Sequence, residues 1–477
     1  MNKLAFSGFL LLCLTLGGVI TGCRGEKEGY SIRIRLDGCS VNDSVFLARF
    51  RGSQIENLHT EKVAPKGNRF SGVDPLKPGM YATGIKGKDI IEFMISDSLD
   101  QQFSIFADIT KVTATLAFKN SPENSALADF TRYLEDNGNR RKDLQRKLLR
   151  FNWQADSVKK FNAAVVQLTT GMKNRTDSLK KEFPGSLLTL NIGLIIYPEI
   201  PEPAVNAEGS DREPDIQEMA YRYYTNHFFD GTDFSDPRLV TIPLYEKKLA
   251  YYFQQVVQPH PDSIYQRIDK ILELAGKNQD VYNFTVRSLY GLYRKSSDPE
   301  NLRVSALIGE NYILSEPDRW NDPAFVEKVR ERTEKSKLNP VGQTATDLRL
   351  ETLSGEKLRL SDVKAALTIL YFFNPDCEAC GPITGHLSLV YRKYQEQGVK
   401  VFAVYLDRQK QKWEKYIASS RLDWLNVYDP DGNERIEERY DIYAIPMIYL
   451  LDSEKRVIAK DVPIEKLEDL LISKTGK

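Results

Sequence analysis

The chain has 477 residues, which is too long for a single hydrophobic core and predicts several domains. Its Lys and Arg residues number 66, as do its Asp and Glu residues, so there is neither the basic excess of a nucleic-acid-binding protein nor the acidic excess of a disordered chain. We therefore expect a globular protein with no nucleic-acid partner.

The N-terminus has the pattern of an export signal. Lys3 precedes the apolar run AFSGFLLLCLTLGGVI, which has the length of a signal-peptide core and is short for a spanning helix. The run closes in VITGC, and polar RGEKEG follows Cys23 at once, which resembles the bacterial lipobox. We expect residues 1–22 to be a lipoprotein signal peptide, Cys23 to carry the lipid, and residues 23–29 to form a tether. The alternative is an apolar helix that ends in Gly-Cys by coincidence.

Two further regions precede the C-terminal part of the chain. Short alternating runs separated by turn clusters such as APKGN predict an antiparallel β-domain over residues 30–119. Residues 120–335 are rich in helix formers with apolar residues every three or four positions, which predicts an all-helical domain. The aromatic clusters YRYYTNHFF and YEKKLAYYFQ are interpreted as its core, with a ligand platform as the alternative. The expected strands of the β-domain are YSIRIRL, SVFLARF, MYATGIK, IIEFMIS, FSIFA and KVTATLAF.

Residues 340–477 alternate between strand and helix patterns. A hairpin is expected around SGEK, and the buried strand ALTILYFF is followed by the helix ACGPITGHLSLVYRKYQEQG. The strand VKVFAVYLD, the helix QKQKWEKYIASS, a strand hairpin in IPMIYLLD and RVIAKDV, and a terminal helix complete the region. This order predicts an α/β domain.

Two of the five cysteines, Cys377 and Cys380, stand where the buried strand turns into a helix. The N–H groups at a helix N-terminus favour a thiolate, and a second cysteine one turn further can resolve a mixed disulfide. Zinc needs four ligands, and His386 is the one histidine near the pair in the sequence, so we expect no metal. A structural disulfide is the remaining alternative to an electron-transfer dithiol.

The dithiol motif and the later AIPMIYLLD stretch resemble the thioredoxin fold of the TlpA/ResA-type thiol-disulfide oxidoreductases, which are exported and tethered to membranes. The resemblance implies that Cys377 and Cys380 are catalytic and form a Cys377–Cys380 disulfide. It also implies that Ile445 and Pro446, at the cis-proline position of thioredoxins, shape the substrate groove. Protein substrates with disulfides or thiols, an upstream membrane electron donor and no cofactor are expected. The whole arrangement is similar to Bacteroidetes lipoproteins whose helical middle domain has no known function.

The sequence departs from the family pattern beside the dithiol. Tyr371 stands at the position of a buried acid, six residues before the first cysteine, and Gly385 replaces a helix-kinking proline. What takes over the role of the acid stays open. Asp376 and Glu378 flank the first cysteine, and their negative charge is expected to tune the thiol pKa toward a reducing couple.

The leading interpretation is a lipid-anchored oxidoreductase on the periplasm-facing side of the cell envelope, with the inner or outer membrane left open. In it, Cys377 attacks a substrate disulfide and Cys380 resolves the intermediate. A disulfide isomerase is the alternative within the same chemistry. A binding or scaffold lipoprotein with a non-catalytic thioredoxin-like module is the alternative from another class. The role of the two preceding domains stays open.

Overall fold

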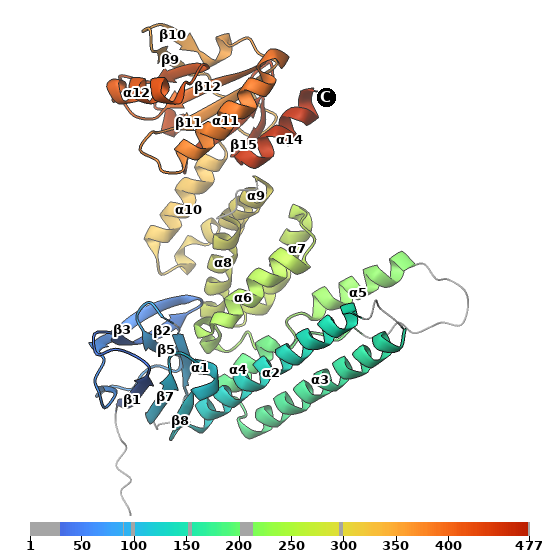
Figure 1. Ribbon diagram of the computed structural model, residues 1–477. Coiled ribbons are helices and arrows are strands. Elements are labelled where there is room, and N and C mark those ends of the chain that lie inside the picture. The colour runs from blue at the N-terminus through green and yellow to red at the C-terminus, as the bar shows by residue number, and fades with distance from the viewer. Residues whose placement is uncertain are drawn as a thin grey trace, which may run out of the picture. The chain divides into compact units, whose positions relative to one another are not determined.

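The structure is a computed structural model, shown in Figure 1. The predicted signal peptide, Cys23 and the tether up to residue 28 lie outside the residues that it describes. Within the described residues, no helix is both long enough and apolar enough to cross a membrane. The described residues are 29–88, 90–96, 101–150, 155–200, 213–294 and 299–475.

The chain divides into two compact units, with breaks after Arg49, Ile55 and Leu188. The domain boundaries that the sequence suggested, near residues 120 and 340, stay predictions.

The N-terminal region folds into two four-stranded sheets, ordered β4-β1-β7-β8 and β3-β2-β5-β6. Strand β1 pairs antiparallel with β4, β5 with β2 and β6, and β7 with β8, whereas β1 and β7 are parallel. The predicted class of an antiparallel β region is confirmed, with this one parallel pair. The strands are β1 (Tyr30–Asp37), β2 (Ser44–Arg51), β3 (Gln54–Lys62), β4 (Asn68–Gly72), β5 (Gly79–Ile85), β6 (Ile90–Ile95), β7 (Gln102–Asp108) and β8 (Ala117–Lys119).

Alternation of apolar residues explains which strands were predicted. In β7, the side chains of Phe103, Ile105 and Ala107 are buried and those between them are not. Strands β3 and β4 were missed because their sequences, QIENLHTEK and NRFSG, lack this alternation. The expectation of one strand in KVTATLAF was wrong. Its first half forms the short helix α1 (Val112–Thr115), where the Thr115 hydroxyl donates to the Lys111 carbonyl oxygen at 2.9 Å.

Helices α2 to α10 confirm the predicted helical middle region. The π-helical turns Tyr252–Val256 and Gly309–Leu314 extend α6 and α9. The helices are α2 (Pro122–Arg150), α3 (Ala155–Glu182), α4 (Leu187–Ile195), α5 (Glu213–His227), α6 (Pro243–Tyr251), α7 (Pro261–Ala275), α8 (Gln279–Arg294), α9 (Pro299–Ile308) and α10 (Pro323–Ser336).

Aromatic side chains form the core of the helical region in the second unit. The Phe228 and Phe229 rings meet edge to face at 5.0 Å between centroids, and Tyr252 packs against both. All three side chains are buried, as the core interpretation of these clusters expects. Lys248 is buried among them, with its ammonium 5.3 Å from the centre of the Phe228 ring and donating to the Ile196 carbonyl oxygen at 3.0 Å. Burial lowers the pKa of Lys248 to about 8.

The C-terminal region is a seven-stranded sheet in the order β10-β9-β13-β12-β11-β14-β15. Strand β11, between β12 and β14, is buried on both faces, which is why its sequence is a continuous apolar run. Helices α11 and α14 pack side by side in this domain (Figure 1). The strands are β9 (Arg349–Thr352), β10 (Lys357–Arg359), β11 (Leu367–Phe373), β12 (Val399–Tyr405), β13 (Leu425–Tyr428), β14 (Met447–Leu451) and β15 (Val457–Lys460). The helices are α11 (Cys380–Tyr394), α12 (Lys410–Ser420), α13 (Ile436–Arg439) and α14 (Ile464–Thr475).

Two buried clusters hold this sheet, one on each face. Ile369, Tyr371 and Phe373 of β11 join the cluster that contains side chains of α11, α12 and α14. Leu370 and Phe372 join the opposite cluster. The predicted hairpin, strands and helices of this region are present, and the sequence analysis missed β13 and α13. Both are only four residues long, which is too short for a periodic pattern.

A close backbone contact in the second unit gives a stability prediction. A Cβ atom on Gly193 of α4 would clash with the Gly231 carbonyl oxygen, so Gly193→Ala forces the backbone apart. We expect a loss of about 1–3 kcal/mol in the free energy of unfolding, measured by urea denaturation. Gly291→Ala is the matched control, because a Cβ there meets nothing within 4 Å on helix α8. It should gain about 0.5–1 kcal/mol. Equal effects of the two substitutions would contradict this account.

Candidate functional site

The two cysteines lie where β11 gives way to α11. The first helical residue is Cys380, so Cys377 lies in the turn that leads into the helix. The backbone N–H of Cys377 donates to the Asn374 carbonyl oxygen, and that of Cys380 to the Cys377 carbonyl oxygen, both at 3.0 Å. Both residues are free thiols, Cys377 half-buried and Cys380 fully buried. The proposed Cys377–Cys380 disulfide therefore stays a prediction about the oxidised protein.

Ile445 and Pro446 lie beside this turn, although they are far away in the sequence. Strand β14 starts at Met447 and pairs antiparallel with β11, with Met447 opposite Phe372. The end of β11 and the start of β14 are therefore neighbours. The Cys377 thiol donates to the Ile445 carbonyl oxygen at 3.3 Å, and the Ile445–Pro446 peptide bond is cis, as the resemblance implied.

The thiol of Cys380 is held in its neutral form. Burial raises its pKa to about 12, and a hydrogen bond with the Cys377 thiol acts in the same direction. A hydrogen bond from the Asn374 backbone opposes these effects. Cys380 is therefore protonated at neutral pH and must lose its proton before it can act as a nucleophile.

Three hydroxyl groups surround the first turn of α11, next to the position of the family's buried acid. The Thr384 hydroxyl donates to the Cys380 carbonyl oxygen at 2.7 Å, and the Tyr416 hydroxyl donates to Thr384 Oγ1 at 3.0 Å. Since the Thr384 hydrogen is already used, the Tyr371 hydroxyl at 2.8 Å is also a donor to Thr384 Oγ1. Burial raises the pKa of Tyr371 further above its ordinary value, so this phenol stays neutral. The three hydroxyls join β11, α11 and α12 behind Cys380.

The two acids that flank Cys377 differ in their surroundings. Both side chains are exposed, and Asp376 forms an ion pair with Lys412 of α12. The Lys412 ammonium offsets the charge of Asp376. Tuning of the dithiol by these acids stays a prediction. Sequence reasoning missed Lys412 because it stands 36 residues away from Asp376 along the chain.

Comparison with known proteins identifies this region. Residues 341–460 match the model of the AhpC/TSA family. The C-terminal region is thus an AhpC/TSA-family, thioredoxin-like domain. It is homologous to ResA-type thiol-disulfide oxidoreductases: it is 26% identical over 117 residues to "Thiol-disulfide oxidoreductase ResA" of Bacillus subtilis, and 30% identical over 117 residues to the protein of that name from Geobacillus thermodenitrificans.

The matches cover only part of each protein. They take in 24% of this chain, and 64% and 66% of the two ResA proteins, which is less than two thirds of their length. A thioredoxin-like protein of Bacteroides caccae, known from a crystal structure, aligns with 58% of this chain and 98% of its own at 21% identity, with a TM-score of 0.47.

The difference in burial between the two thiols predicts selective alkylation. In the native reduced protein at pH 8, iodoacetamide should modify Cys377 and leave Cys380 unmodified, because the latter is buried and its pKa is raised to about 12. Peptide mapping by mass spectrometry measures this, with urea-unfolded protein as the control in which both react. Modification of Cys380 in the folded protein at the rate of Cys377 would contradict the geometry described above.

Proposed function

We propose that the protein is an extracytoplasmic thiol-disulfide oxidoreductase that reduces disulfides in protein substrates. The observation that carries this proposal is the hydrogen bond between the Cys377 thiol and the Ile445 carbonyl oxygen. The bond holds the half-buried thiol against a partly exposed stretch of backbone, where an extended substrate segment can dock with its disulfide next to the sulfur.

The reaction proceeds in two exchanges. The Cys377 thiolate attacks one sulfur of the substrate disulfide, forms a mixed disulfide, and releases the other substrate sulfur as a thiolate. Cys380 then loses its proton and attacks the Cys377 sulfur. The Cys377–Cys380 disulfide forms, and the second substrate sulfur leaves and is protonated. Two electrons pass from the dithiol to the substrate, so the product is a substrate with two thiols.

Proton removal from Cys380 uses no acid at the family's usual position, since Tyr371 stands there. The departing substrate thiolate is a base close to the reacting sulfurs, and it takes a proton as the reaction ends. The hydroxyls of Tyr371, Thr384 and Tyr416 keep the first turn of α11 fixed during the exchange. The half-buried Tyr416 connects this group to the protein surface.

The membrane anchor, the electron donor and the docking groove belong to the same proposal. The lipid on Cys23 anchors the chain on the periplasm-facing side of the envelope, and a membrane electron donor returns the dithiol to its reduced form. Ile445 and Pro446 shape the groove in which substrates dock. A protein that serves only as a scaffold would need neither a resolving thiol nor a donor, which gives the test below.

Trapping separates an oxidoreductase from a scaffold. In Cys380→Ser, the first exchange proceeds and the second cannot, so mixed disulfides with substrate proteins should accumulate in cells. They should be visible on non-reducing gels and disappear on reduction. Cys377→Ser/Cys380→Ser should trap nothing.

Cys39→Ser is the matched control for the third cysteine, whose thiol donates to the Leu36 carbonyl oxygen at 2.9 Å in the β-domain. It should leave trapping by Cys380→Ser unchanged. Absence of trapped proteins in Cys380→Ser, under conditions in which the protein is made and folded, would reject the oxidoreductase and favour the scaffold.

A further inference from the structure

The loop that carries Ile445 is held by a side chain from the helical middle region. Arg332, on α10, forms an ion pair with Asp441, and its guanidinium lies 4.1 Å from the centre of the Tyr443 ring. The Arg332 and Asp441 side chains are 14% and 4% exposed, so this pair is shielded from solvent and from salt. Asp441 and Tyr443 stand four and two residues before Ile445, which faces Cys377.

A second set of contacts ties the end of α10 to the same place. The Lys460 ammonium, at the end of β15, donates to the Ser336 carbonyl oxygen at 2.7 Å and to that of Leu338 at 3.2 Å. It also lies 4.0 Å from the Asp441 carboxylate. The Tyr443 hydroxyl bonds to Asp461, the residue after β15. The loop of residues 441–446 is therefore bonded both to α10 and to the end of β15, at the edge of the sheet.

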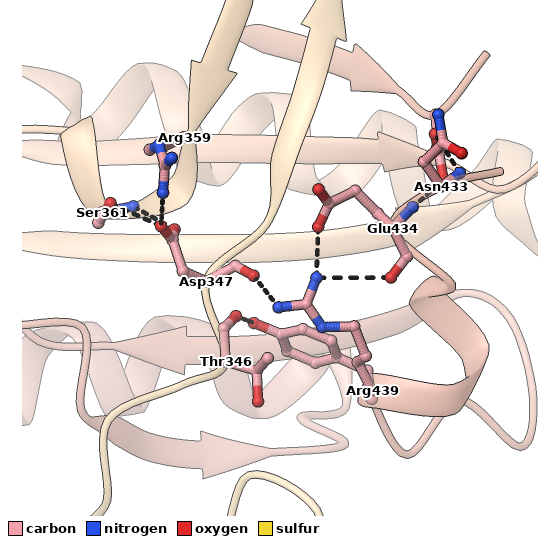
Figure 2. Close-up of polar contacts among 9 residues, drawn as sticks. Thr346, Asp347, Arg359, Ser361, Asn433, Glu434 and Arg439 are labelled. Atoms are coloured by element: carbon pink, nitrogen blue, oxygen red, sulfur yellow. Dashed lines mark hydrogen bonds and ion pairs between the residues drawn. The ribbon is translucent and has the colours of Figure 1, made fainter. Parts of the chain in front are cut away.

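The linker after α10 fixes the chain just ahead of the loop. The Asn339 side chain donates to the Arg439 carbonyl oxygen at 2.8 Å and accepts from the Thr346 N–H at 2.7 Å. Figure 2 shows the other side of this segment, where the Arg439 guanidinium bonds to Glu434 and to the Asp347 carbonyl oxygen. Hydrogen bonds thus hold Arg439, two residues before Asp441, to the linker that follows α10.

Helix α10 is also part of the helical region itself. Its Thr333 and Val329 side chains pack closely on Gly309, leaving no room for a Cβ there. Lys337, just after the helix, forms an ion pair of 2.5 Å with Glu310. If the helices that α10 packs on displace it, Arg332 moves with α10 and Asp441 is displaced as well.

We propose that Arg332 is a positioning residue for the substrate groove, through which helix α10 fixes the loop of residues 441–446 and so the backbone that docks the substrate. This inference rests on the proposed function and gives the helical region a role in it. A buried guanidinium that pairs with a carboxylate and stacks on a ring holds both groups in one geometry. Without it, the Ile445 carbonyl samples positions that no longer match an extended peptide, while the thiols are unchanged.

The test compares Arg332→Met with Arg287→Met, since Arg287 on α8 contacts the N-terminal end of α10. Arg287 bonds to Asp322, the N-cap residue of α10, at 2.8 Å and lies 3.8 Å from the centre of the Phe325 ring. Arg287→Met therefore removes an ion pair and a ring contact without touching the loop, in a pair that is more exposed, at 34% and 44%. Because Arg332→Met strands a buried carboxylate, Arg332→Met/Asp441→Asn is made as well, and it removes both charges. Arg332→Lys keeps the positive charge, so its effect on the peptide KM should be smaller than that of Arg332→Met.

Three readouts use the full chain: KM and kcat for a disulfide-bonded peptide, the rate with the small disulfide 5,5′-dithiobis(2-nitrobenzoic acid), and amide hydrogen exchange of residues 441–445. For Arg332→Met and the double variant we expect KM for the peptide to rise about tenfold, because the Ile445 carbonyl oxygen is no longer held where it can dock the peptide. The rate with the small disulfide should stay within about twofold, because that reagent needs no groove. The Ile442 amide, which bonds to the Tyr440 carbonyl oxygen at 2.9 Å, should exchange faster. Arg287→Met should change none of these.

The outcomes separate the inference from the function that it rests on. Folded Arg332 variants with unchanged peptide KM and unchanged exchange would overturn the positioning role and leave the proposed function standing. Equal effects in Arg287→Met would show a general loss of stability and overturn it too. A wild-type protein that reduces neither disulfide would reject the proposed function. In that case, faster exchange in Arg332→Met alone would still establish that the pair holds the loop.

Discussion

Strand β11 is buried on both faces, and the position of the whole site depends on that burial. Its alternate side chains enter the two clusters of the C-terminal domain, so the strand cannot slide by one residue without moving apolar side chains between them. The turn that follows this strand carries Cys377, and the strand pairs with β14, which begins beside Pro446. A thiol and a carbonyl oxygen 68 residues apart meet because one strand is pinned in register.

Much of this could be predicted from the sequence, because the informative features are local. The apolar run of β11, the cysteine spacing and the Ile-Pro dipeptide are each contained in a few residues, and together they predicted the fold of the C-terminal domain. Tyr371 was recognised as a departure at the position of the buried acid, and the structure shows that its hydroxyl joins Thr384 and Tyr416. Strands β3 and β4 gave no signal, because they lack alternating apolar residues.

The sequence could not predict ion pairs between residues that are far apart in the chain and are brought together by the fold. Lys412 on α12 forms an ion pair with Asp376, and Arg332 on α10 forms one with Asp441, 109 positions further along the chain. Nothing in a charged surface pattern says which of many acids a given basic residue will find. The Lys412–Asp376 pair offsets the charge of an acid that was expected to act on the Cys377 thiol. The Arg332–Asp441 pair connects the helical region to the loop beside that thiol.

The central claim is that Cys377 and Cys380 form a reversible, reducing dithiol couple. Burial raises the pKa of Cys380, so the reduced form is not stabilised by a thiolate at this position. A less stable reduced form favours a low, reducing reduction potential. Equilibration of the full chain with dithiothreitol or glutathione buffers, read by thiol alkylation and mass spectrometry, measures the reduction potential. The account predicts a value near the roughly −270 mV of thioredoxin. A value near the roughly −120 mV of a strong oxidant, or no reversible couple at all, would contradict it.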